Sequence, residues 1–154
     1  MKRLLILTLA LLGTHTLSAQ SVEVGAHAPR IRGVEWISDE PEKRARAMMV
    51  EFFHSTNEDC REHIDHLNAL ASDFRYEMDV VVLTREPSEQ VAYMLLHEYQ
   101  FFYVATDERG DMFRSFGVNH VPYAVIINPR GIIIWVGNPL TLDKKMIKKL
   151  LQQK

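Results

Sequence analysis

The single cysteine of the chain, Cys60, is the residue with the most evident chemistry. Its thiol could form a disulfide with another molecule, but one cysteine allows no disulfide within the chain. Residues 55–59 read Ser-Thr-Asn-Glu-Asp and offer N-cap side chains followed by acids that suit the positive end of a helix dipole. The sequence therefore predicts a thiol in the first turn of a helix.

The charges around Cys60 disagree about its reactivity. Arg61 and His63 favour a thiolate, whereas four nearby acids disfavour it: Glu58, Asp59, Glu62 and Asp65. A free cysteine is also commonly a small buried hydrophobic residue. A reactive thiol and an inert buried one both stay open.

Glu51 is the second candidate for chemistry. It interrupts the apolar run over residues 47–53, which is typical of a strand covered on both faces. A carboxylate in such a strand could serve as a proton acceptor, or it could be a hydrated or salt-bridged acid at the strand end.

The segments that must position these residues alternate between strand and helix. After the first strand, an apolar face recurs at helical spacing through Cys60, Ile64, Leu67, Ala71 and Phe74. Strands are expected over residues 78–83, 102–105, 122–127 and 132–136, the last two forming a hairpin, and helices over 88–99 and 111–116 and after Thr141 or Asp143. This order predicts an α/β domain with a central mixed β-sheet and helices on both faces.

The N-terminus predicts export. Two basic residues, Lys2 and Arg3, precede an apolar run over residues 4–13 that is too short to span about 30 Å of hydrocarbon. We expect residues 1–19 to be a signal peptide cleaved after Ala19, and residues 20–154 to form one domain. The residue directly after the cleavage site, Gln20, is not a cysteine, so no lipid anchor or other stable membrane anchor is expected, and the location would be periplasmic or secreted.

Composition limits the function classes. The chain has 154 residues, of which 47% are hydrophobic and 25% charged, with a formal net charge of −2. These values are typical of a globular protein, and the negative net charge argues against a nucleic-acid partner, which would need a clustered basic face.

Three segments resemble the thioredoxin fold, and in particular the exported TlpA-like thiol-disulfide oxidoreductases, known broadly as redoxins. Residues 24–29 are similar to that family's Gly-x-x-Ala-Pro entry, and residues 51–53 to its acidic-Phe-Trp strand end. Residues 116–131 are similar to Tyr-Gly-Val-x-x-Val-Pro-Thr-x-x-x-Ile-Asp-x-x-Gly. The resemblance covers nearly the whole chain after the signal peptide, and it implies a thioredoxin-like fold.

The chain departs from this family where the family has Cys-x-x-Cys, because residues 57–60 read Asn-Glu-Asp-Cys. Asn57 stands at the position of the nucleophilic cysteine, and Cys60 at that of the resolving cysteine. The usual two-electron cycle therefore cannot be completed within one chain. Asn57 could cap the helix only, or it could also bind the backbone of a ligand.

The resemblance also assigns roles to neighbouring residues. Val121 and Pro122 match the family's cis-proline site, whose preceding backbone pairs with an extended substrate peptide; an ordinary proline at a strand start is the simpler alternative. Glu51 matches the buried acid that deprotonates the resolving thiol. Cys60 and Glu51 are thus candidate catalytic residues, and Asn57, Val121 and Pro122 candidate substrate-binding residues.

The function expected from these residues is single-cysteine thiol–disulfide chemistry, in which Cys60 forms a mixed disulfide with a protein or small-thiol partner and no cofactor is required. The main alternative is a noncatalytic peptide- or partner-binding module. A peroxiredoxin-like peroxidase is disfavoured because the required proline and threonine are missing at Phe53 and Asn57.

Two further clusters carry weaker interpretations. No metal is expected, because the possible ligands lack a tetrahedral spacing motif: His54, Cys60, His63 and His66. An aromatic run is expected to flank a strand in the core rather than form a docking patch: Tyr99, Phe101, Phe102 and Tyr103.

Overall fold

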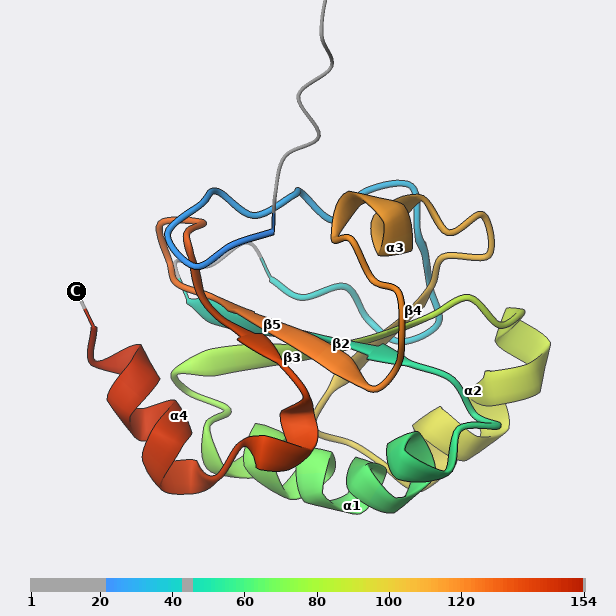
Figure 1. The fold of residues 1–154 in the computed structure, drawn as a ribbon. Helices are drawn as coiled ribbons and strands as arrows, with labels where there is room; N and C mark the ends of the chain where they lie inside the picture. The colour runs from blue at the N-terminus through green and yellow to red at the C-terminus, as the bar shows by residue number, and fades with distance from the viewer. Residues whose placement is uncertain (1–21, 43–45, 154) are drawn as a thin grey trace, which may run out of the picture.

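A six-stranded mixed sheet forms the centre of the computed structural model, which describes residues 22–42 and 46–153 (Figure 1). The strand order is β1-β4-β3-β2-β5-β6. The strands are β1 (Glu35–Trp36), β2 (Ala47–Phe53), β3 (Met78–Thr84), β4 (Tyr103–Thr106), β5 (Tyr123–Ile127) and β6 (Ile133–Gly137). The predicted signal peptide lies outside the described residues.

The directions of the strands make the sheet mixed. Strands β2, β3 and β4 are parallel neighbours, whereas β5 runs antiparallel to β2, β6 antiparallel to β5, and β1 antiparallel to β4. Strands β2 and β3 are central and almost completely buried. Their continuous apolar sequences follow from this position, because both faces of each strand are covered.

Helices cover both faces of the sheet unequally. The helices are α1 (Glu58–Asp73), α2 (Ser88–His97), α3 (Asp111–Ser115) and α4 (Lys144–Leu151), with a 3₁₀ turn, η1, at Pro139–Thr141. Apolar side chains of α1, α2 and α4 pack in one core with β2 and β3, and those of α3 pack on the opposite face with the segment that precedes β1. Figure 1 shows α1 and α4 below the sheet and α3 above it. The predicted α/β architecture is confirmed.

The predicted boundaries need small corrections. Helix α2 ends at His97 rather than at residue 99, and β4 begins at Tyr103 rather than at residue 102. Neither β1 nor η1 was predicted; β1 has two residues, too few to show a periodic pattern. No helix in the described part of the chain is long and apolar enough to cross a membrane.

Candidate functional site

The loop between β2 and α1 holds the site, and Asn57 begins the helix. Asn57 has extended backbone angles, φ −79° and ψ 125°, and its Oδ1 accepts a hydrogen bond from the Cys60 backbone N–H at 2.9 Å. Glu58 and Asp59 occupy the first turn, where the helix dipole favours acids. Among the cap candidates in the sequence, the structure therefore selects Asn57.

Asn57 also joins α1 to the segment before β5. Its Nδ2 donates a hydrogen bond to the Val121 carbonyl oxygen at 3.2 Å, and the Val121–Pro122 peptide bond is cis. Pro122 is buried and Val121 half-buried. The structure thus brings together four of the five residues singled out in the sequence: Asn57, Cys60, Val121 and Pro122.

Cys60 lies in the core at 0% exposure. Burial raises the pKa of its thiol to about 11; a backbone hydrogen bond from His54 works in the other direction, and the negative charges of Glu51, Asp59 and Glu86 add to the rise. The thiol is therefore protonated at neutral pH, and the start of α1 alone does not make it a thiolate.

Arg61 does not offset these charges from a position beside the thiol. Its side chain turns back to the loop and donates a hydrogen bond to the Ser55 carbonyl oxygen at 2.9 Å. Of the two basic residues expected to favour a thiolate, Arg61 thus stabilises the loop instead.

Glu51 projects from β2 toward α1, on the same face as Met49 and Phe53. It is completely buried, and its Oε2 lies 3.4 Å from Nε2 of His63, which is 2% exposed. Burial raises the pKa of the Glu51 carboxyl group, and this effect exceeds the opposing influence of His63 and His66. No pattern in the sequence directly pairs Glu51 with His63.

The separation of Glu51 and His63 fits an ion pair, but the geometry is not that of a hydrogen bond. Within the described residues, neither carboxylate oxygen of Glu51 nor Nε2 of His63 has a hydrogen-bond partner. Buried polar groups in folded proteins are nearly always paired, so three such atoms together require an explanation. His63 could have been found earlier, because it shares the helical face formed by Leu67, Leu70 and Phe74.

A second polar group, Glu86, anchors the loop from the segment after β3. Its carboxylate accepts hydrogen bonds from the Ser55 N–H at 2.8 Å, from the Ser55 hydroxyl, and from the Thr84 hydroxyl at 3.0 Å. Sequence reasoning missed this network. The signal was present, because parallel strands β2 and β3 end at the same edge of the sheet and residues after them must meet there.

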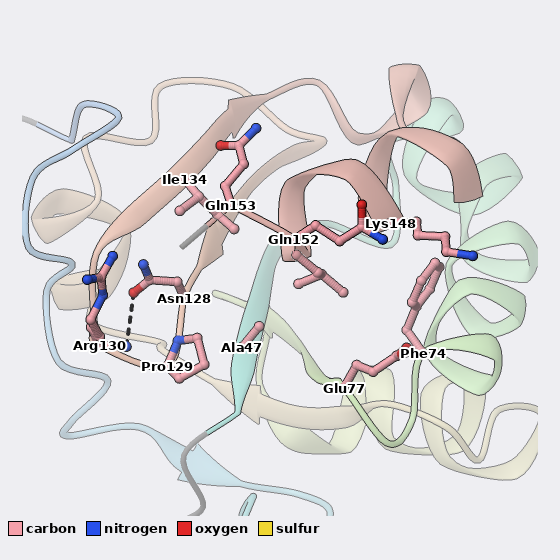
Figure 2. Close-up of a pocket in the computed structure, with 11 residues that line it drawn as sticks. Ala47, Phe74, Glu77, Asn128, Pro129, Arg130, Ile134, Lys148, Gln152 and Gln153 are labelled. Carbon is pink, nitrogen blue, oxygen red and sulfur yellow. Dashed lines mark hydrogen bonds between the residues drawn. The ribbon is translucent and has the colours of Figure 1, made fainter.

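A cavity of about 520 Å³ lies at the other end of β2, beside Ala47 (Figure 2). Its walls are mostly apolar and include Phe74, Ile134 and Leu151. Figure 2 shows the Arg130 and Lys148 side chains at opposite ends of the group of lining residues. The polar groups therefore do not converge on one point, and the cavity is separate from the Cys60 site.

The two remaining clusters from the sequence are the possible metal ligands and the aromatic run. No group of three or more His, Cys, Asp or Glu side chains within residues 22–42 and 46–153 is placed to hold a metal ion. Phe102 of the aromatic run is buried and stacks with Tyr99 at 5.5 Å between ring centroids, whereas Phe101 is exposed.

Comparison with solved structures identifies the fold. A protein from Chlorobium tepidum, provisionally named the thiol:disulfide interchange protein DsbE, superposes with a TM-score of 0.71 at 19% identity, over 85% of this chain and 99% of that one. The C-terminal domain of a provisionally assigned thiol-disulfide oxidoreductase from Bacteroides thetaiotaomicron superposes with a TM-score of 0.70 at 12% identity. The match covers 86% of this chain and 99% of that domain. The exposed lipoprotein thioredoxin Etrx1 of Streptococcus pneumoniae superposes with a TM-score of 0.60 at 17% identity. The match covers 71% of this chain and 86% of Etrx1.

These similarities show that the chain has a thioredoxin-like fold, as the resemblance in its sequence implied. No protein-family model matches the sequence, and the search of curated proteins finds no match.

Proposed function

We propose that this chain performs thiol–disulfide exchange with one cysteine, in which Cys60 forms a transient mixed disulfide with a partner held beside Val121 and Pro122. The observation that carries the proposal is Glu51, a fully buried carboxyl group that has no hydrogen-bond partner among the described residues and lies on the same side of the sheet as the only thiol. Such a group is costly to bury. A proton acceptor for Cys60 gives it a purpose, and structural neighbours named as thiol-disulfide oxidoreductases support a redox role of this general kind.

The proposed exchange transfers one proton and forms one sulfur–sulfur bond. Glu51 accepts the proton of Cys60, and the thiolate attacks a disulfide of the partner. One partner sulfur becomes bonded to Cys60, and the other leaves as a thiolate that takes up a proton. A second thiol, from the partner or from a small molecule, then reduces the mixed disulfide and releases Cys60. The raised pKa of Glu51 suits it to accept a proton from a weakly acidic thiol.

Asn57 controls access in this proposal. Its side chain lies between the start of α1 and Val121, where it makes the hydrogen bonds to both sides described above. An incoming sulfur would occupy the position that belongs to the first cysteine of a Cys-x-x-Cys motif. Asn57 must therefore swing away from Val121 before Cys60 reacts.

The docking part of the proposal rests on the backbone of Val121. In the described part of the chain, no group accepts a hydrogen bond from the Val121 N–H. An extended peptide could pair with this N–H, and with the carbonyl oxygen once Asn57 moves. The partner would thus be a protein segment containing a cystine, or a small disulfide.

We also propose that the protein acts after export, with residues 1–19 as a cleaved signal peptide. The basic N-terminus and short apolar run support export. Etrx1, one of the structural neighbours, is named an exposed lipoprotein thioredoxin, which is consistent with a function outside the cytoplasm.

A noncatalytic binding module is the second candidate, and one observation favours it. Cys60 has no exposed surface in this structure, and Asn57 closes the route from Val121. In this case the Val121 backbone would bind a peptide, and Cys60 would be part of the core.

The two candidates separate in one experiment. A peptide whose cysteine carries a chromogenic thiol in disulfide linkage is mixed with the native protein and with the Cys60→Ser variant. If Cys60 exchanges, the wild-type protein releases one equivalent of the chromophore from the peptide, and the peptide stays bonded to Cys60. The Cys60→Ser variant releases none. Equal binding to both proteins without release would instead support the binding module.

A further inference from the structure

Glu51 and His63 form an isolated polar pair inside the apolar core. The neighbours of Glu51 across the sheet are Val82 on β3 and Ala124 on β5, which carry no charge. The groups that act electrostatically on Glu51 come from α1 and are His63 and His66. Burial has the largest effect on the pKa of this carboxyl group, and the two histidines of one helix act against it.

The pair has two arrangements that differ only in the position of one proton. With Glu51 ionised, a charged His63 donates from Nε2 to Oε2; with Glu51 protonated, its hydroxyl donates to a neutral His63. The present 3.4 Å separation becomes a hydrogen bond after a small side-chain movement. Proton-transfer contacts are commonly loose in a resting structure and tighten during reaction.

His66 connects this pair to the surface. It follows His63 by three residues, so the two rings lie side by side on α1, with 5.4 Å between their centroids. Nε2 of His66 lies 3.2 Å from the Leu142 carbonyl oxygen, which can only accept, so Nε2 carries the hydrogen. Nδ1 of a neutral His66 is then free of hydrogen and can accept a proton. His66 is exposed, whereas His63 is buried.

We infer that Glu51 and His63 share a proton in the core and that His66 exchanges this proton with solvent beside Leu142, so that α1 contains a proton relay behind Cys60. When Glu51 takes the proton of Cys60, the excess proton leaves through His63 and His66, and it returns by the same route. Use of the relay in thiol exchange rests on the function proposed above, but the relay exists in the resting protein without any partner.

Glu51 acts on the neighbouring thiol, and so do two further charges that do not lie on this route. Asp59 in the first turn of α1 and Glu86 after β3 act on Cys60. Both are absent from the groups that act on Glu51. Protonation of Glu51 has its own carboxyl signal, distinct from that of the thiol, and it provides the direct test.

The test measures the protonation of Glu51 by infrared spectroscopy of its carboxyl group, identified by its loss in Glu51→Gln. His63→Gln removes the partner that stabilises the carboxylate, so the titration of Glu51 moves to higher pH; His66→Gln moves it in the same direction by less. His97→Gln, on the exposed side of α2, leaves it unchanged. An unchanged Glu51 titration in both His63→Gln and His66→Gln would overturn the shared proton.

A pH jump tests the route itself. Protonation of Glu51 after the jump is expected to be severalfold slower in His66→Gln than in wild type or in His97→Gln. Equal rates would overturn the role of His66. If His63→Gln does not fold, the His66→Gln titration and kinetics still decide the question, because His66 is exposed.

A further variant separates this inference from the proposed function. Cys60→Ser is expected to retain the Glu51 titration shift and the jump kinetics while losing all exchange. Failure of exchange with an intact relay would reject only the proposed function, whereas intact exchange with unchanged histidine-variant titrations would reject only the relay.

Discussion

The Asn57 amide nitrogen donates a hydrogen bond to the Val121 carbonyl oxygen at 3.2 Å, while the oxygen of the same amide caps α1. One side chain thus performs two tasks: it stabilises the first turn that contains Cys60, and it ties this turn to the segment before β5. The account of a single-cysteine exchange protein depends on separating these two tasks.

Substitution of Asn57 separates them. Asn57→Ala removes the cap and should lower the free energy of unfolding by about 1 kcal/mol, whereas Asn57→Ser keeps a capping oxygen and should cost much less. Alanine has no donor, and the serine hydroxyl is one bond nearer the backbone than the Asn57 amide nitrogen and falls short of Val121, so both variants should expose Cys60 to alkylation faster than wild type. Chemical denaturation and alkylation rates measure the two effects. Unchanged alkylation in both variants would show that Asn57 does not close the site.

The pH dependence of Cys60 alkylation tests its environment. Burial and negative charges raise the pKa of Cys60 to about 11. The alkylation rate of the native protein should therefore keep rising with pH beyond about pH 8.5, which is the pKa of a free thiol. Glu51→Gln removes one of those charges and should move the midpoint to lower pH. Iodoacetamide rates in wild type, the variant and the unfolded chain provide the measurement. A native midpoint near 8.5 would contradict the buried environment.

Stability should depend on pH through Glu51. Its pKa in the folded protein is raised above the ordinary value of 4.5, so the native state binds more protons than the unfolded chain once the pH exceeds that value. The stabilisation is complete below pH 4.5 and is lost as the pH rises through the folded pKa. Glu51→Gln should flatten this part of the profile, whereas Glu77→Gln, on the surface, should keep the wild-type slope. Identical slopes in all three proteins would be the contrary result.

Glu86 should be important for stability although it lies outside the proposed chemistry. Its buried carboxylate accepts hydrogen bonds from Ser55 and Thr84, so Glu86→Gln should lower the free energy of unfolding by about 1–3 kcal/mol. Glu89→Gln, on the exposed side of α2, should change it by less than about 0.5 kcal/mol. Urea denaturation compares the two. Equal small effects would show that the Ser55 loop does not need Glu86.

The sequence allowed the fold to be predicted because its main elements have strong local patterns. The apolar runs of β2 and β3 and the helical spacing along α1 indicate burial from the residues alone. Strand β1 could not be found, because two residues joined to β4 by pairing carry no periodicity.

The candidate site could be predicted only partly. Asn57, Cys60, Val121 and Pro122 were found through their order in the sequence and the family resemblance. The burial of Cys60, the pairing of Glu51 with His63 and the Glu86 network depend on contacts between separate elements. A charge count around Cys60 includes residues that point to solvent and omits Glu86, so it could not determine the environment of the thiol.

The most direct test of the central claim compares two disulfide reagents on native protein under single-turnover conditions. One is the extended peptide that carries a chromogenic thiol, and the other is the small symmetric disulfide of the same chromophore. The account predicts that the native protein reacts faster with the peptide, through Cys60, and that this preference disappears when the chain is unfolded. Reaction of Cys60 with either reagent only after unfolding would contradict single-cysteine exchange.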